Sequence, residues 1–344
     1  MLRDGNEIGE AATLIRRKRA SLNSTPRTRA PASAPTSAIR QDGAAGEGQL
    51  HYGTHVRAAL AGTVIELVDF QRQRQFAIVQ KNRSERAIES LIASTMGFRI
   101  DATEKDRKSV FASAKAFRLA VERGGEGHTD LGTQNRSALS ALSPLILISA
   151  SNRGPWVDLR SRVEKDMARL TRTLPVYDFA KSVRGFGDLG LACLVAEAGI
   201  PIGDYRTVSG LWKRMGLAVF DGKRQQKCRD KDEAERHGYS PKRRAEVWAF
   251  CSDSMFRAQW RGGDEDAGIV AGPIGVYGEI YARRRLRTDP RIEATADLPA
   301  TDRDKWTKGR CHNDARRVMS KALLRDLWRV WRGMPPRGLA EGYE

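Results

Sequence analysis

The chain has 344 residues and carries 60 Lys and Arg against 42 Asp and Glu, which gives a formal net charge of +18 at pH 7. With 40% hydrophobic residues it can bury a core, which excludes a wholly disordered chain. A strongly positive protein attracts polyanions, so we expect nucleic acid as the partner. An anionic membrane surface is a weaker candidate for the partner. The simplest alternative is that the charge only keeps the protein soluble.

The cysteines and the apolar segments predict a soluble, cytoplasmic protein. The four cysteines, Cys193, Cys228, Cys251 and Cys311, lie far apart without a C-x-x-C pair, which is typical of reduced thiols. The histidines do not join them at zinc-finger spacing, so we expect no metal site and no cofactor, unless catalysis requires a divalent metal. No N-terminal apolar segment predicts a secretory signal, and the most apolar stretch, 141–150, is too short to span a membrane.

Residues 1–50 are expected to form a disordered basic tail. Segment 21–48 is built from Ser, Thr, Ala, Pro and Gly, and it offers too little apolar surface to offset the loss of chain entropy on folding. The basic cluster at 14–19 either contacts phosphates or only keeps the start of the chain soluble, and the sequence leaves both possibilities open.

Residues 51–174 are predicted to form a helical arm or small bundle, interrupted by glycines at 124–127. Apolar residues recur there at helical spacing, without period-two alternation, and further helices are expected at 139–147 and 156–174. Such helices favour packing or coiled-coil-like self-association, so a homo-oligomer through this segment is an expected partner. The predicted apolar faces are Val64, Leu67, Val68, Phe76, Ile88, Leu91 and Ile92, then Val110, Phe111, Ala114, Phe117 and Val121, and then Leu159, Val163, Met167 and Leu170.

Residues 175–333 are predicted to form a second helical domain, followed by a tail at 334–344, so the whole chain is expected to be all-α. Helices are predicted at 177–182, 188–198, 208–215, 241–261, 277–287 and 315–332. In the last of these we expect a buried stripe of Met319, Leu323, Leu327 and Val330, surrounded by the cations Arg316, Lys321, Arg325, Arg329 and Arg332.

Segment 183–192, VRGFGDLGLA, predicts a helix-hairpin-helix. Glycines in such a turn permit positive φ and a close approach of the backbone to a ligand, and the free N–H groups of the next helix suit a phosphate oxygen. The hairpin would hold a nucleic-acid backbone without reading bases. An ordinary turn between helices, with C-capping glycines, is the alternative. The residues expected to hold phosphate are Arg184, Gly185, Gly187 and Gly190.

Three basic clusters downstream extend this expected DNA-binding surface, although a charged run is also typical of a solvated helix face. They are Lys213 and Arg214, Lys223 and Arg224, and Lys242, Arg243 and Arg244. Trp248 shares a helical stripe with Cys251, Met255 and Ala258, so we interpret it as a core residue rather than a base-stacking platform.

Two pairs of side chains are candidates for catalysis. Glu197 and Asp204 could hold a divalent metal. His312 and Asp314 could act as a base or ligand pair, although Asp314 would also suit a helix cap. Neither pair identifies a reaction, so the catalytic residues stay unknown.

The order of several blocks resembles the C-terminal domain of DEDD-type insertion-sequence transposases of the one-ten family. These blocks are RGFG at 184–187, LVAEAG at 194–199 and LWKRMGL at 211–217. Three later blocks are similar to phage- and prophage-borne transposase-like proteins: GVYGEIYARRR at 275–285, WTKGRCHNDAR at 306–316 and KALLRDLW at 321–328. The resemblance covers about residues 175–332. It implies a DNA-binding protein of DNA transposition or recombination in a mobile element or prophage.

The chain also departs from that family. Active members carry an N-terminal ribonuclease-H-like domain with four metal-binding acidic residues, whereas 51–174 is predicted to be helical. They also place a nucleophilic serine soon after a Gly-Leu-Ala-Pro block. Here no serine follows Gly216 until Ser240, which suits a helix cap before Pro241. Three functions therefore stay open: a DNA-binding transposase-like protein, a metal-dependent nuclease or recombinase, and an RNA-binding or assembly module.

Overall fold

The computed structural model describes residues 54–125, 136–220, 222–263, 266, 270–302 and 304–338. The predicted tail at 1–50 lies outside these ranges, as do Gly127 and the end of the tail predicted at 334–344. The described chain is all-α, as predicted. Its strands are the two antiparallel pairs β1 (Val219–Phe220) with β2 (Lys223–Arg224) and β3 (Trp260–Arg261) with β4 (Gly272–Pro273).

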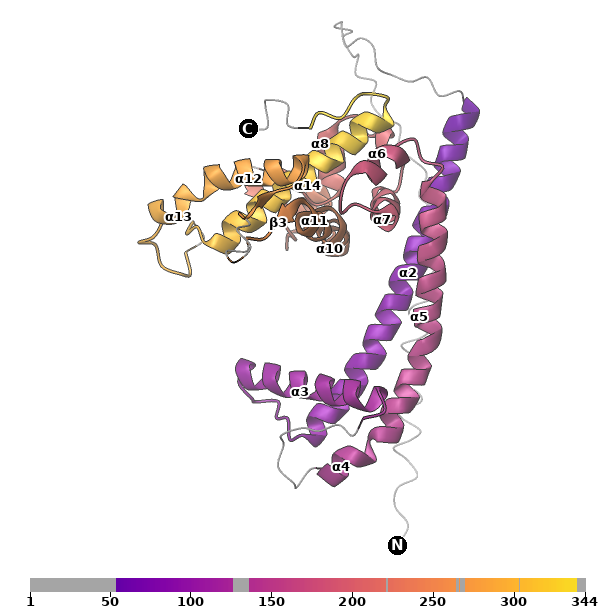
Figure 1. Cartoon of the computed structure of the whole chain (residues 1–344), viewed down its shortest axis with the longest axis vertical. Helices are drawn as coiled ribbons and strands as arrows, with labels where there is room; N and C mark the ends of the chain where they lie inside the picture. The colour runs from indigo at the N-terminus through magenta and orange to yellow at the C-terminus, as the bar shows by residue number, and fades with distance from the viewer. Residues whose placement is uncertain are drawn as a thin grey trace, which may run out of the picture. The chain divides into compact units, whose positions relative to one another are not determined.

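Two long helices, α2 (Thr54–Thr95) and α5 (Ser143–Thr171), lie side by side and antiparallel (Figure 1). At the C-terminal end of α2 they pack with α3 (Glu104–Glu122) and α4 (Arg136–Ala141) around a small apolar core that includes Phe117. The sequence predicted separate helices at 139–147 and 156–174. The structure instead divides this region at Leu142, and α5 runs without a break from Ser143 through Pro155 to Thr171.

Most residues of the predicted arm stripes are buried or half-buried, but Phe76 and Leu91 are 53% and 42% exposed. The buried face of α2 changes its partner along the helix. Val64 and Leu67 belong to one core and Ile92 to another, and the buried residues between the two cores are mostly polar: Gln71, Arg74, Gln75 and Ala77. A single apolar stripe drawn along all of α2 therefore assigns some residues to the wrong face.

The C-terminal domain is built around α7 (Asp188–Ala198), which is buried on nearly every side. The other elements are α6 (Tyr177–Ser182), η2 (Ile202–Asp204), α8 (Val208–Arg214), α9 (Lys231–His237), α10 (Pro241–Trp248), the π-helix η3 (Ala249–Ser254), α11 (Met255–Gln259), α12 (Val276–Thr288), α13 (Pro290–Ala294) and α14 (Lys308–Trp331). The first half of α2 and the second half of α5 share the core of this domain, so apolar contacts continue across residue 174. Among the described helices, none has both the length and the apolar composition that a bilayer crossing needs.

The last helix, α14, buries Met319, Leu323 and Leu327 as predicted. It begins seven residues earlier than expected, because the Thr307 side chain caps it by accepting a hydrogen bond from the Arg310 amide. Of the cations expected to surround this stripe with positive charge, Arg316 and Arg325 are themselves buried and form ion pairs. Their carboxylate partners are Asp253 and Asp326.

Candidate nucleic-acid interface

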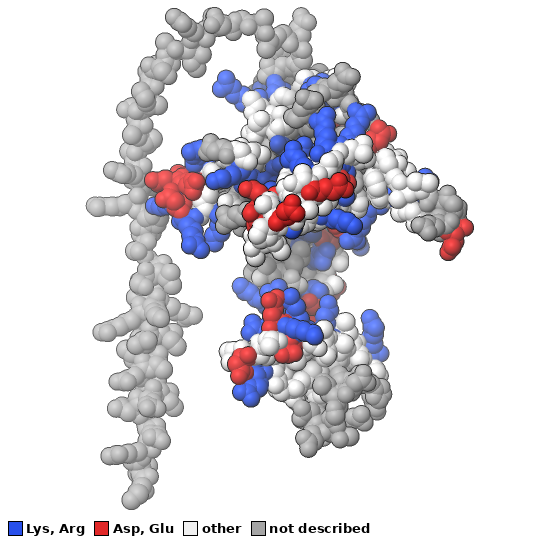
Figure 2. Space-filling model, turned by 90° about the vertical axis from the view of Figure 1, so that its left-hand side faces the viewer, with Lys and Arg blue, Asp and Glu red and all other residues white. Residues whose placement is uncertain are grey.

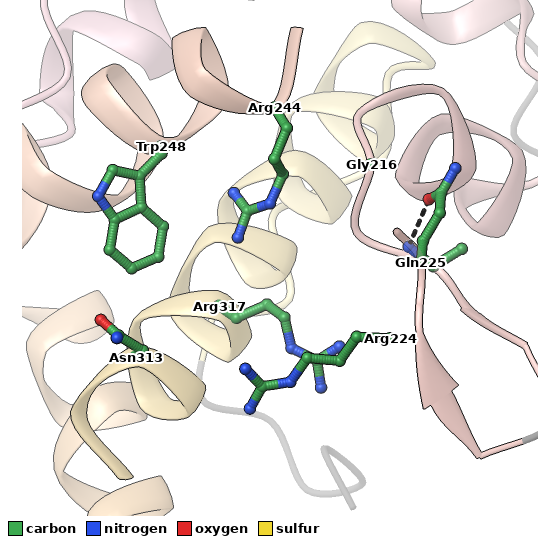
Figure 3. Close-up of a pocket in the computed structure, with 8 residues that line it drawn as sticks. Gly216, Arg224, Gln225, Arg244, Trp248, Asn313 and Arg317 are labelled. Atoms are coloured by element: carbon green, nitrogen blue, oxygen red, sulfur yellow. Dashed lines mark hydrogen bonds between the residues drawn. The ribbon is translucent and has the colours of Figure 1, made fainter. Parts of the chain in front are cut away.

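Three arginines meet at a cavity of about 230 Å³ in the C-terminal domain (Figure 3). Arg224 comes from β2, Arg244 from the first turns of α10, and Arg317 from the middle of α14. We call this cavity the arginine pocket. Its other lining residues are Gly216, Ala218, Gln225, Trp248 and Asn313. Arg244 and Trp248, like Asn313 and Arg317, are four residues apart on a helix, so each pair faces the same side.

Local hydrogen bonds fix the segment that carries Arg224. The buried side chain of Gln225 accepts a hydrogen bond from the Ala218 amide at 3.2 Å and donates to the carbonyls of Lys213 and His237 at 3.1 and 2.6 Å. The neighbouring Gly216 has φ +73°, and a Cβ there would lie 3.2 Å from Cδ of Arg244. The end of α8, the β1–β2 hairpin and α10 therefore meet closely at the pocket.

The start of α10 directs Arg244 into the pocket. Ser240 caps the helix by accepting a hydrogen bond from the Arg243 amide, and Pro241 occupies the first turn, so the predicted capping role of Ser240 is confirmed. Trp248 lines the pocket half-buried, whereas Cys251 and Met255 are fully buried. The prediction that Trp248 is a core residue is therefore wrong, because the π-helix that follows it shifts the helical phase of the stripe.

Positive charge exceeds negative charge around the pocket. Asp314 is the shared carboxylate: one oxygen lies 2.8 Å from Nη2 of Arg224 and the other 2.7 Å from Nε of Arg284. Arg317 is the third cation near it, at 3.5 Å. Arg244 forms no ion pair with any described residue, and its guanidinium carbon lies 5.3 Å from the centroid of the Trp248 ring. The Asp314 carboxylate is thus shared by three arginines, and Arg244 has no carboxylate partner among the described residues.

Several guanidinium nitrogens in the pocket are buried without a hydrogen-bond partner among the described residues. They are Nη1 of Arg244 and both Nε and Nη1 of Arg317. Burial lowers the pKa of the Arg244 and Arg317 guanidinium groups, and the charge of Arg224 lowers it further. Burial followed by the charge of Arg317 lowers the pKa of Lys321, one turn further along α14, to about 8. Buried polar groups normally have partners, so these nitrogens indicate a site for an anion.

Asp314 remains ionised despite its burial. Burial on its own would raise the pKa of this carboxyl, but the hydrogen bond from Arg284 and the charges of Arg284 and Arg317 lower it below its usual value. Asp314 lies inside α14 and not at its start, so the helix-cap interpretation is wrong. His312 bonds instead to the hydroxyl of Tyr281, at 2.8 Å, so no bond joins it to Asp314 as a catalytic pair.

Each predicted basic cluster contains a residue that lines the pocket or lies within three residues of one. Lys213, Arg214, Lys223, Arg224 and Lys242 are exposed on the loop and helix ends around it. Figure 2 shows Lys and Arg side chains over much of the face of this domain that is in view, with Asp and Glu in fewer places. Arg243 differs, because its side chain bonds to the Arg214 carbonyl at 3.0 Å and lies 3.6 Å from Glu197.

The predicted hairpin is present, with α6 and α7 at the predicted bounds. Gly185 has φ +83°, and a Cβ there would lie 2.5 Å from Cβ of Ala258 and 2.9 Å from the Ser254 carbonyl oxygen. Ser254 donates a hydrogen bond to the Gly185 carbonyl at 2.8 Å. A Cβ on Gly190 would meet the ring of Phe186 at 3.3 Å. Packing of the turn against α11 and within the hairpin therefore accounts for these two glycines.

Of the four hairpin residues that were expected to hold phosphate, Arg184 and Gly187 are exposed. A Cβ on Gly187 would meet nothing within 4 Å. The structure does not bring the hairpin and the arginine pocket together. The hairpin packs near Ser254 and Ala258, whereas the pocket uses Arg244 at the other end of the same helical run. The separation from Arg244 to Ser254 is about 15 Å along the helix axis.

The carboxylates Glu197 and Asp204 have separate surroundings. Glu197 accepts hydrogen bonds from Nε2 of Gln71 and of Gln75, at 3.1 and 2.7 Å, so it joins α7 to the arm. Asp204 is exposed in η2. Among the described residues no bond links the two, and Glu197 is already engaged in a structural contact.

Sequence reasoning missed Asn313, Arg317 and the ion-pairing role of Asp314. The i, i+4 spacing of Asn313 and Arg317 was a readable signal for a shared helix face. A scan against protein-family models, a search of curated proteins and a search of solved structures each found no match to this chain.

Proposed function

We propose that this chain is a DNA-binding transposase-like protein that acts in transposition or recombination of a mobile element or prophage, and that the arginine pocket takes a phosphate of the DNA backbone. The observation that carries the proposal is the set of buried guanidinium nitrogens of Arg244 and Arg317 that have no protein acceptor among the described residues. A phosphate oxygen is the acceptor that matches them in charge and geometry.

The surroundings of the pocket support a polyanion rather than a single small anion. Exposed cations on three segments lie within three residues of residues that line it, and DNA presents many phosphates in a row to such a surface. Phosphate contacts position a protein without specifying sequence, so binding through this surface is expected to tolerate many sequences and to weaken with salt. The role in transposition comes from the resemblance of residues 175–332, and the expected cytoplasmic location belongs to the same proposal.

The test is the affinity of the full chain for a labelled DNA duplex, measured by fluorescence anisotropy across a salt series. The pocket variant is Arg244→Gln/Arg317→Gln. The control is Arg99→Gln/Arg169→Gln, which removes the same charge from exposed arginines of the arm. We expect the pocket variant to lose about tenfold to a hundredfold in affinity and to reduce the salt slope by about 1. The control should stay within about twofold.

Equal losses in the two variants would contradict the proposal, because the charge would then act diffusely. Tighter binding of structured RNA than of duplex DNA at equal salt would replace it with the RNA-binding alternative. Circular dichroism of each variant checks that the helices remain.

A further inference from the structure

A second cluster of chemically reactive side chains lies beside the β1–β2 hairpin. Sγ of Cys228 lies 3.2 Å from Nδ1 of His237, and Glu233 brings a carboxylate oxygen to the same place. The three atoms all lie within 4.8 Å of one another. They come from the loop before α9 and from one face of α9, where Glu233 and His237 are four residues apart.

The surroundings hold these side chains in position. Asp230 caps α9 by accepting a hydrogen bond from the Glu233 amide at 2.8 Å. The His237 ring stacks on Phe220, with the centroids 4.2 Å apart and the planes at 11°. The His237 carbonyl accepts the 2.6 Å hydrogen bond from Gln225, so the end of α9 is fixed to the loop that carries Arg224.

The donor set indicates the kind of ion. A thiolate, an imidazole nitrogen and a carboxylate are ligands of zinc, whereas magnesium and calcium prefer oxygen alone. In a tetrahedral site the usual Zn–S and Zn–N bond lengths place sulfur and nitrogen about 3.5 Å apart, so the observed pair needs only a small adjustment. One thiolate and one carboxylate would neutralise a divalent cation in a domain that is otherwise strongly positive.

We propose that Cys228, Glu233 and His237 bind one zinc-type divalent cation, with the fourth position open to water or to an outside ligand. The sequence predicted no metal site, because a C-x4-E-x3-H pattern is not that of a zinc finger and a carboxylate is a common residue type on any helix surface. The ion would join the loop before α9 to the end of that helix.

The test uses the full chain, purified under reducing conditions, stripped with a chelator and titrated with Co²⁺ as a spectroscopic probe. We expect about one equivalent to bind, with a thiolate-to-cobalt charge-transfer band and the intense d–d bands of a tetrahedral site, and we expect Zn²⁺ to displace it. Cys228→Ser should abolish the charge-transfer band. Glu233→Gln should weaken Co²⁺ binding at least about tenfold.

The matched control is Asp232→Asn, because Asp232 is exposed in the same first turn of α9 and its loss changes the helix charge equally. It should bind Co²⁺ within about twofold of the wild-type chain, since it contributes no ligand. The inference is overturned if the wild-type chain shows no charge-transfer band, if Cys228→Ser keeps it, or if Asp232→Asn weakens binding as much as Glu233→Gln. None of these outcomes depends on DNA binding.

Discussion

The two ends of the helical run 241–259 present contrasting surfaces. At the α11 end the glycine hairpin packs tightly, and the nearby Arg257 forms an ion pair at 2.8 Å with Asp253, a carboxylate that Arg316 also uses. At the α10 end Arg244 has no carboxylate partner among the described residues, and its neighbours share Asp314. Packing thus explains Gly185 and Gly190 of the hairpin, but it does not explain the surplus of positive charge at the other end of the helical run.

The two ends differ in what could explain their residues: close helix packing for the glycines, and a bound anion for the arginines. A glycine that allows close approach can serve another helix as well as a ligand, and the Gly185 contacts identify the helix. Cations held together without acceptors raise the free energy of the folded chain, because burial removes water and like charges repel. An anion that enters such a site relieves both penalties, so the pocket is the better candidate for binding.

The largest expected effect tests the charge balance of the pocket. Replacing Asp314 by Asn removes the carboxylate that Arg224, Arg284 and Arg317 share, and should lower the free energy of unfolding by about 3 to 5 kcal/mol. Urea denaturation in phosphate-free buffer measures it. Added inorganic phosphate should restore part of the loss by binding the folded state. Asp166→Asn, at an exposed ion pair, is the control and should stay within about 0.5 kcal/mol.

The same variant should change the acid sensitivity of the protein. The pKa of Asp314 is lower in the folded chain than in the unfolded chain, so its stabilisation is present above about pH 4 and is lost as the pH falls through the folded value. Asp314→Asn should lack this part of the acid dependence. If the variant is as stable as the wild-type chain, the arginines do not repel one another strongly and the charge argument fails.

The next effect tests the packing explanation of the hairpin. Gly185→Ala forces a side chain into positive φ and into contact with the Ser254 carbonyl, so it should cost about 2 to 4 kcal/mol in the free energy of unfolding. Gly187→Ala has open space and φ −88°, so it should cost about 1 kcal/mol or less. Equal costs in denaturant titrations would contradict the packing explanation.

The sequence was informative where structure is local. The spacing of apolar residues and the positions of glycines predicted the bounds of α6 and α7, because the start and end of a helix depend on neighbouring residues. The arginine pocket could not be predicted in this way. Arg224 and Arg317 meet only because α14 packs against α8 and η3, which lie far from it in the sequence. The π-helix after Trp248 also changes which residues share a face.

The variants Arg244→Gln and Arg184→Gln compare how much the arginine pocket and the hairpin each contribute to duplex affinity. Arg244→Gln should lower duplex affinity about tenfold, and it should leave stability unchanged or raise it by up to about 1 kcal/mol, because it removes a buried cation without a carboxylate partner. Arg184→Gln, at an exposed side chain, should change affinity by less than about threefold and leave stability unchanged. Anisotropy and urea titrations on the same samples give both quantities. The reverse order of affinities would assign the main phosphate contact to the hairpin.

The smallest effect tests whether an anion in the pocket reaches Arg317. Lys321 has a pKa of about 8, lowered by burial and then by the charge of Arg317. Because an unfolded lysine titrates near 10.4, the unfolded chain binds more protons between about pH 8 and pH 10.4, and stability should rise with pH across that window. After allowance for solvent screening, the wild-type chain should gain about 1 to 2 kcal/mol relative to Lys321→Met.

Urea titrations from pH 8 to pH 10 measure this difference, with the exposed Lys108→Met as the control. Phosphate bound beside Arg317 would offset its charge and bring the pKa of Lys321 closer to that of an unfolded lysine, so saturating phosphate should reduce the difference. A difference that phosphate leaves unchanged would mean that the anion does not lie beside Arg317, and it would return the hairpin to consideration as the phosphate site.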